Sequence, residues 1–247
     1  QRRNCMIDQQ RLIRYAAQVG VELSAPAAEK CAVYAARLVE WNQKMNLTAI
    51  TDPEGMLIKH YLDSLTAVPC LPAGAKTLID VGTGAGFPGV VLGLCCPWLK
   101  ITLLDSLQKR LTFLEELCRE LELPVTLVHA RAEEGGRRPD LREQFDVATA
   151  RAVAALPVLA EYCLPFVKPG GRFVAMKGPD AAQELQAAAR AIAVLGGKVT
   201  DDRLLTLPVE ADYTGEKAER RLILVDKIAP TPQKYPRPSA KMAKQPL

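Results

Sequence analysis

Thr77-Leu78-Ile79-Asp80-Val81-Gly82-Thr83-Gly84-Ala85-Gly86-Phe87-Pro88-Gly89 is the stretch of this chain that decides the fold. Its first five residues are mostly apolar and partly β-branched, as in a strand covered on both faces. Glycines follow at alternate positions, and without a side chain they let a ligand approach the backbone closely. The next run, Val90 to Cys96, is apolar and predicts a helix. A strand, a glycine turn and a helix N-terminus together predict a nucleotide-type binding site.

Two cofactors could use such a turn. Residues 84–89 match the dinucleotide pattern GxGxxG, which is a weak signal by itself. Asp80 stands two residues before the first glycine, in a frame that resembles the first motif of class I S-adenosylmethionine (SAM) methyltransferases. A carboxylate there would repel the pyrophosphate of NAD but is favourable near a sulfonium and an amino group. We therefore expect SAM ahead of NAD, with cofactor contacts from Asp80, Gly82, Gly84 and Gly86.

The composition is that of a globular protein. The chain has 247 residues, of which 49% are hydrophobic and 24% charged, enough for one α/β domain and a smaller appendage. No apolar run approaches the ~18 residues of a membrane span, so we expect no membrane association. Residues 1–4 contain no apolar stretch, so we expect no signal peptide. Since there is no initiator Met, we expect a trimmed chain or a fragment.

Cysteine and histidine usage indicates the redox compartment and argues against one kind of metal site. The seven cysteines include no CxxC pair and most stand in apolar surroundings, which predicts buried thiols in a reducing cytosol. The cytoplasm is therefore the expected compartment. The only histidines are His60 and His129, so we expect no His-rich metal site.

The chain divides into three predicted parts. Residues 1–74 repeat apolar positions at helical spacing and end at breakers near 70–75, which predicts a helical N-terminal segment. Residues 75–228 alternate strands and helices, which predicts a mostly parallel sheet with helices on both faces. Residues 229–247 form a tail with four cations and no acid, equal to the whole net charge of +4. Such a tail indicates a polyanion partner, although a merely solvated terminus would look the same.

Within 75–228 the expected elements follow one another closely. We expect a helix from the cap Ser106 to about Leu123, another over about 153–167, and a third from Pro179-Asp180 to about Leu195. Pro169-Gly170-Gly171 predicts a turn, and a polar hairpin-like excursion is expected between the last two strands. The expected strands are 77–81, 100–104, 125–130, 145–150, 172–177, 197–207 and 219–227.

Two acidic positions follow strands of this predicted sheet. Asp105 ends the second strand, and a carboxylate there can accept both ribose hydroxyls of an adenosine, which SAM and NAD share. Ala132 and Glu133 follow the third strand, where an acid and backbone amides can bind an adenine. We count Asp105, Ala132 and Glu133 as cofactor-binding residues.

The fourth strand ends at Arg151. It lacks the Asn/Asp-Pro-Pro-Tyr/Phe element that holds an exocyclic amine, and it lacks a Pro-Cys pair for covalent attack on a pyrimidine. Arg151 could contact the cofactor carboxylate, an RNA phosphate or a guanine edge. A salt bridge to Asp80 or Glu133 is the plainer alternative.

Several motifs together resemble the RsmG (GidB) family of methyltransferases, over nearly the whole chain from about Arg11. They are Trp41-Asn42-x-x-Met45-Asn46-Leu47-Thr48, His60-x-x-Asp63-Ser64, residues 80–89, Asp105-Ser106-x-x-Lys109-Arg110, residues 149–152, Met176-Lys177-Gly178 and Lys234-Tyr235-Pro236-Arg237. The tail departs from the family pattern, because Ser239-Ala240-Lys241-Met242 stands where the family usually has a Pro-Gly-like turn and another proline.

The resemblance implies a bacterial enzyme with a Rossmann-like class I fold that methylates N7 of a guanosine, number 527, in 16S ribosomal RNA with SAM. By resemblance, SAM contacts fall on Gly82, Phe87, Ala132, Glu133 and Arg151. The partner would be 16S rRNA, the small ribosomal subunit or its precursor. A class I methyltransferase acting on another RNA, a protein or a small molecule is the alternative, and an RNA-binding assembly factor without catalysis is a further one.

Such a reaction needs no general base, because guanine N7 carries a free lone pair, so we expect no catalytic acid–base residue. The methylated ring is cationic, so nearby cations should hold phosphate or cofactor instead of lying over the ring. For RNA binding we expect Lys109, Arg110, Lys177, Lys234, Tyr235 and Arg237. Trp41 or Tyr235 could stack on a base, although Trp41 fits better as a core residue.

Overall fold

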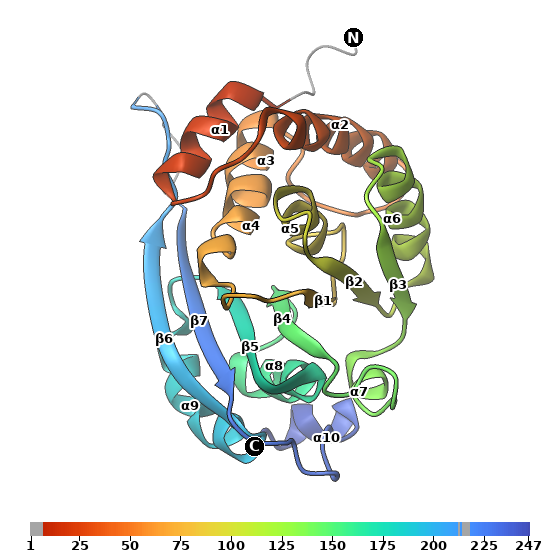
Figure 1. The fold of residues 1–247 in the computed structure, drawn as a ribbon, viewed down its shortest axis with the longest axis vertical. Coiled ribbons are helices and arrows are strands. Elements are labelled where there is room, and N and C mark those ends of the chain that lie inside the picture. Colours follow the sequence, from red (N-terminus) through yellow and green to blue (C-terminus); the bar gives the residue numbers. More distant parts are fainter. Residues whose placement is uncertain (1–6, 212, 214–217) are drawn as a thin grey trace.

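A seven-stranded sheet forms the centre of the molecule. The computed structural model describes residues 7–211, 213 and 218–247. The strand order is β3-β2-β1-β4-β5-β7-β6 (Figure 1). The first five strands are parallel, whereas β7 is antiparallel to β5 and to β6. The strands are β1 Thr77–Val81, β2 Lys100–Asp105, β3 Val125–His129, β4 Phe145–Arg151, β5 Val167–Lys177, β6 Gly197–Thr206 and β7 Glu219–Lys227.

Helices cover both faces of this sheet, as expected, and each face has its own hydrophobic core. Side chains alternate along β1, so Leu78 packs into one core and Ile79 into the other. The Leu78 side is covered by α1 (Gln9–Gln18), α2 (Ala25–Asn42), α5 (Gly89–Cys95) and α6 (Gln108–Glu120). The Ile79 side is covered by α8 (Leu156–Cys163) and α9 (Ala181–Val194). Both faces of β1 are therefore buried, which explains its nearly unbroken apolar sequence.

The remaining helical elements are short. They are α3 Pro53–Met56, the π-helix η2 Leu57–Leu62, α4 Asp63–Leu65, α7 Ala132–Gly135, α10 Ser239–Lys244 and the 3₁₀ turns η3 Val68–Cys70 and η4 Leu164–Phe166. Residues 57–65 are helical as expected, but the first 6 of them form a π-helix, a form that is frequent at functional sites. Its turn presents His60 and its successor α4 presents Asp63, both buried.

The N-terminal helices share a core with the sheet. Leu12 of α1, Leu38 of α2 and Leu62 of η2 pack in the same cluster as Leu78 of β1. Ser24 caps α2 by accepting a hydrogen bond from the Ala27 amide at 3.2 Å. The division at residues 74 and 228 stays a prediction.

Several element boundaries differ from the sequence-based expectation. α6 begins at Gln108 and Ser106 does not cap it; the Asp105 carboxylate accepts from the Leu107 amide instead, at 2.9 Å. The helix expected from residue 153 begins only at Leu156. The expected turn at Pro169-Gly170-Gly171 lies inside β5, where the register against β4 jumps and Gly170 has a φ of +90°.

The C-terminal tail packs against the body of the molecule. Arg142 of the segment before β4 donates to the carbonyls of Tyr235 at 2.7 Å and Thr231 at 2.9 Å. Met242 of α10 is fully buried. The tail thus closes the bottom of the molecule in Figure 1, next to α8 and α9.

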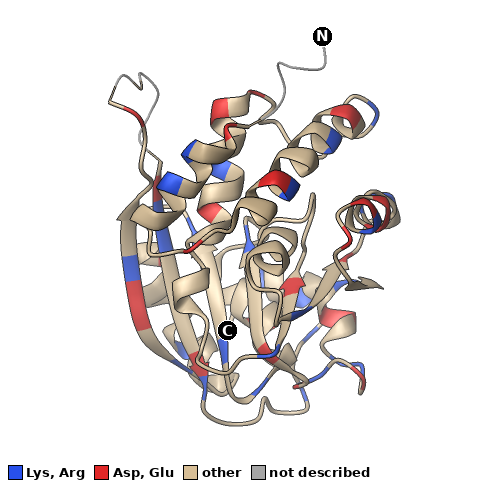
Figure 2. Ribbon diagram, turned by 45° about the horizontal axis from the view of Figure 1, so that its top comes forward, with Lys and Arg blue, Asp and Glu red and all other residues tan. Residues whose placement is uncertain are grey.

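The described cysteines agree with the expectation of unpaired thiols. Cys5 lies outside the described residues, and so does part of the expected excursion between β6 and β7. The six described thiols are free, and all except Cys95 are buried. Within the described ranges, no helix combines the length and the apolar character needed to cross a membrane. In the view of Figure 2, basic and acidic residues are interspersed along the helices and strands.

Candidate functional site

The glycine turn between β1 and α5 has the left-handed backbone that its sequence predicts. Gly82, Gly84 and Gly86 have φ values of +69°, +60° and +102°. A Cβ on Gly86 would lie 2.5 Å from the Tyr34 hydroxyl, whereas a Cβ on Gly84 would meet no atom within 4 Å. Gly86 is therefore required for packing, and Gly84 leaves the space in front of the turn open.

Asp80 holds the glycine turn in place through two hydrogen bonds. Its Oδ2 accepts hydrogen bonds from Thr83 Oγ1 at 2.7 Å and from the Gly89 amide at 2.8 Å. The side chain is completely buried, and burial raises the pKa of this carboxyl to about 6. Among the described residues, Oδ1 has no hydrogen-bond partner. Asp80 does not line the pocket described below. In this structure it supports the loop, and a direct contact of Asp80 with the cofactor stays a prediction.

Asp105 joins the end of β2 to the turn. Its Oδ2 accepts from the Gly84 amide at 2.9 Å and from Arg110 Nη1 at 3.4 Å. Because both oxygens accept bonds from the protein, the carboxylate is fixed in place while lone pairs remain for a ligand. Arg110, expected to bind RNA, pairs with this acid.

A pocket of about 330 Å³ opens at the carboxyl ends of β1, β2 and β3. We call it the glycine-turn pocket; it is lined by Val81, Gly82, Leu104, Asp105, Ser106, Arg110, Ala130, Arg131, Ala132, Glu133, Ala152, Val153, Tyr162 and Ser239. It brings together four of the expected cofactor residues, namely Gly82, Asp105, Ala132 and Glu133. Tyr162 and Ser239 were missed, because their distance in sequence from the turn gave no signal.

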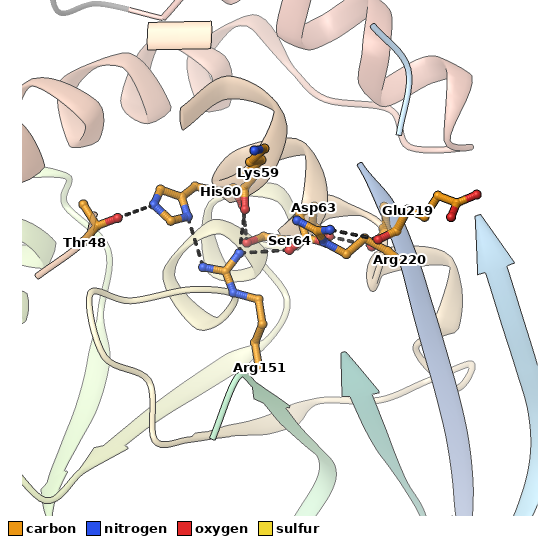
Figure 3. Close-up of polar contacts among 9 residues, drawn as sticks. Thr48, Lys59, His60, Asp63, Ser64, Arg151, Glu219 and Arg220 are labelled. Carbon is orange, nitrogen blue, oxygen red and sulfur yellow. Dashed lines mark hydrogen bonds and ion pairs between the residues drawn. The ribbon is translucent and has the colours of Figure 1, made fainter. Parts of the chain in front are cut away.

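The Arg151 side chain does not line this pocket and points towards η2 and α4, which carry Lys59, His60 and Asp63 (Figure 3). Its Nη1 donates to the Lys59 carbonyl at 2.9 Å and to Asp63 Oδ2 at 3.0 Å. Arg220 Nε donates to the other oxygen of Asp63, also at 3.0 Å. The acid beside Arg151 is thus Asp63, and neither of the two suggested partners, Asp80 and Glu133, bonds to it.

His60 links Arg151 to the loop after α2. Arg151 Nη2 lies 3.1 Å from His60 Nδ1, and Thr48 Oγ1 lies 2.8 Å from Nε2. Because a guanidinium can only donate, Nδ1 is the acceptor and Nε2 carries the proton. Burial, with a smaller contribution from Arg151, lowers the pKa of His60 to about 3, so the ring is neutral. Asn42 fixes Thr48 by accepting from its amide at 3.0 Å.

Phe87 lies inside an aromatic stack. Its ring is parallel to those of Tyr34 and His60, with centroids 4.9 and 4.5 Å away, and only 4% of the residue is exposed. The Arg151 guanidinium lies 5.2 Å from its centroid. Phe87, like Gly84 and Gly86, does not line the glycine-turn pocket. Its ring packs against Arg151 and His60, and its expected contact with the cofactor stays a prediction.

A second pocket of about 300 Å³ lies beside the first and shares Ala152 with it. We call it the network pocket; it is lined by Ile50, Lys59, His60, Asp63, Arg151, Ala152, Met176, Lys177, Gly178, Arg220, Arg221 and Leu222. Lys177, expected to bind RNA, lies here and donates to the Ala154 carbonyl at 2.8 Å.

Of the tail residues expected to bind RNA, Tyr235 and Arg237 make contacts within the protein. Tyr235 is 6% exposed, which leaves little of its ring accessible to a base in this structure. Arg237 forms an ion pair with buried Glu161 at 2.7 Å. Lys234 is exposed above the Tyr235 ring, and Lys109 is exposed on α6. Trp41 is half-buried and packs against the edge of the core, with its ring centroid 5.5 Å from that of Phe113.

Comparison with known proteins places the chain in a family. Residues 27–206 match the family model of GidB, rRNA small subunit methyltransferase G. A ribosomal RNA small subunit methyltransferase G from Lactobacillus johnsonii is 52% identical over 94% of this chain and 96% of its own length. Another, from Acetivibrio thermocellus, is 48% identical over 96% of this chain and 95% of its own length.

Solved structures agree on the fold. A precorrin-6y C5,15-methyltransferase from Geobacter metallireducens aligns with a TM-score of 0.52 and 19% identity, over 72% of this chain and 89% of its own. A SAM-dependent O-methyltransferase from Thermotoga maritima aligns with a TM-score of 0.51 and 18% identity, over 79% and 72%. These likenesses concern the fold alone. On the sequence matches, the chain belongs to the GidB family, rRNA small subunit methyltransferase G.

Proposed function

We propose that this chain transfers a methyl group from SAM to N7 of guanosine 527 in 16S ribosomal RNA. Membership of the GidB family supports the reaction class and the RNA. The observation that carries the proposal is the pair of adjoining pockets at the carboxyl ends of the parallel strands. One is lined by Gly82 and Asp105, the other by Arg151, and they meet at Ala152. Ligands of such sheets bind at this edge.

The glycine-turn pocket suits SAM. Asp105 would accept hydrogen bonds from the ribose hydroxyls, and Ala132 and Glu133 would lie against the adenine. The open space at Gly84 allows close approach to the backbone, and the unpartnered Asp80 Oδ1 adds negative potential beneath the turn. When bound, SAM supplies an electrophilic methyl group on a sulfonium.

The protein's contribution is alignment and a suitable electrostatic environment. Guanine N7 has an available lone pair, so no residue has to remove a proton before attack. Holding the two reactants in line can supply several kcal/mol of the barrier reduction, roughly 7–11 at best. Arg151 is held by the Lys59 carbonyl, Asp63 and His60, so its position is well defined. We propose that it orients the substrates from the boundary of the two pockets.

The partner is ribosomal RNA in naked form, in the small subunit or in its precursor, and the compartment is the cytoplasm. Exposed Lys109, Lys234, Lys241 and Lys244 are available for phosphate contacts. Each phosphate contact releases counterions, so the affinity for RNA should fall as salt rises. Five of the six described thiols are buried and none is paired, which suits a reducing compartment.

Two measurements test this proposal. Calorimetric titration should show SAM binding and no NAD binding, and the reverse would exclude a methyltransferase. Methyl-labelled SAM should then label ribosomal RNA from a strain that lacks the modification. Label that appears only in another RNA, a protein or a small molecule would support the alternative class I methyltransferase instead.

A further inference from the structure

The network pocket is a second cavity beside the cofactor residues. Its lining residues come from the ends of β4 and β5, the start of β7, and from η2 and α4. Figure 3 shows five of them, namely Lys59, His60, Asp63, Arg151 and Arg220. Its volume of about 300 Å³ is at the lower end for small-molecule sites. Because the two cavities share Ala152, a ligand in one lies next to a ligand in the other.

The walls of the network pocket combine apolar side chains with hydrogen-bond donors. Ile50, Met176 and Leu222 supply apolar surface that a flat base can pack against. The polar lining is mostly cationic, with Lys59, Arg151, Lys177, Arg220 and Arg221, and these side chains donate but cannot accept. Guanine presents the acceptor O6 where adenine presents a donor amino group. A donor lining therefore favours guanine over adenine.

Neighbouring carboxylates form ion pairs with most cations of the network pocket. Asp63 pairs with Arg151 and Arg220, each at 3.0 Å. Glu184 lies 2.9 Å from Lys177, and Asp202 lies 2.6 Å from Arg221. Four of the cations thus share three carboxylates. The pocket offers donors without a large excess of positive charge, which matters because N7 methylation makes the base cationic.

We infer that the network pocket receives the target guanine after the base has left its stack in the RNA. The inference rests on the proposed methyl transfer to ribosomal RNA. Enzymes that do chemistry on a base commonly take it out of its stack and hold it in a fitted pocket, where it can be aligned with the second reactant. Bound there, the base lies beside the methyl donor, and Asp63 acts as a positioning residue because it fixes both guanidinium groups.

Filling the pocket tests the inference. Gly178 lines it, and a Cβ there would meet no atom within 4 Å, so Gly178→Trp can place an indole in the cavity without a clash at the backbone. We expect rRNA methylation to fall about 100-fold or more while the Kd for SAM stays unchanged. Asp180→Trp is the matched control, because Asp180 is exposed and lies outside the pocket. This variant should keep the wild-type rate of rRNA methylation and the wild-type Kd for SAM.

A second pair of variants covers the case in which the indole prevents folding. Arg220→Gln removes a donor of the network pocket and does not touch the glycine-turn pocket, so kcat for rRNA should fall with the SAM Kd unchanged. Arg203→Gln, on neighbouring β6 with its own partner Asp201, should behave as wild type.

The outcomes are distinguishable. Wild-type rates in Gly178→Trp, or in Arg220→Gln if the first variant does not fold, would overturn the inference and leave the proposed function intact. Loss of SAM binding in step with methylation would also overturn it, because the cavity would then belong to the cofactor site. A wild-type protein that does not methylate rRNA would overturn both.

Discussion

Gly84 faces open space at the turn, and its amide donates to Asp105, which lines the glycine-turn pocket. Asp is one of the residues that tolerate its φ of +60°, and therefore Gly84→Asp should fold. The new carboxylate would stand beside Asp105 and fill the approach to the turn. We expect methyl transfer to be abolished, as measured by labelled methyl incorporation.

Gly74→Asp is the control for this substitution. Gly74 also has a left-handed φ, of +77°, and open space around a Cβ, but it lies in the loop before β1. It should lose the same small amount of stability as Gly84→Asp and keep full activity. If both variants are equally active, the glycine turn is not part of the site.

His60 predicts a dependence of stability on pH. Its pKa falls from the ordinary 6.5 to about 3 on folding, so the unfolded chain binds a proton more readily. The contribution of neutral His60 is therefore complete above pH 6.5 and is lost as the pH falls towards 3. At pH 5 the loss is about 2 kcal/mol relative to pH 7.5.

Denaturant unfolding of wild type and His60→Gln at the two pH values measures this contribution. The variant should lose less stability on acidification than wild type. Asp80, whose raised pKa of about 6 acts in the opposite direction, is present in both proteins and cancels in the comparison. Identical pH dependence in wild type and His60→Gln would contradict the buried neutral imidazole.

At the scale of elements, the tail is attached to α8 by an ion pair. Glu161 is buried, and accepts from the amide and the guanidinium of Arg237. Removing one partner of a buried pair costs about 3 kcal/mol, so Glu161→Gln should lower the free energy of unfolding by that order. Since Ser239 lines the glycine-turn pocket, the Kd for SAM should rise as well.

Glu115→Gln on the exposed face of α6 provides the comparison for that variant. It should change neither the unfolding free energy nor the Kd for SAM. An unchanged SAM Kd in Glu161→Gln, together with lost stability, would separate the tail from the cofactor site.

The local sequence predicted most helices and strands, because apolar runs and glycine turns determine these elements over short distances in the chain. The apolar run of β1 and the alternate glycines after it are sufficient to place a strand and a turn. The contacts of Arg151 could not be predicted, because His60 and Asp63 are 91 and 88 residues away in sequence. The same reason explains why Tyr235 and Arg237 were expected to bind RNA: their partners Arg142 and Glu161 come from other parts of the chain.

At the scale of the whole molecule, three stretches of the chain meet around one edge of the sheet. The N-terminal helices contribute His60 and Asp63, the parallel strands contribute Asp105 and Arg151, and the tail contributes Ser239. The adjoining pockets therefore depend on all three stretches. Their geometry suits the transfer of a group between two ligands that lie on either side of Ala152.

The most direct test of this account is to map the methyl group. The protein is incubated with methyl-labelled SAM and small-subunit RNA from a strain lacking the modification, both as naked RNA and as assembled subunits, and the labelled nucleotide is identified. We predict a single label on N7 of guanosine 527. A label on another atom or nucleotide, or no label in either form of the RNA while SAM binds normally, would contradict the account.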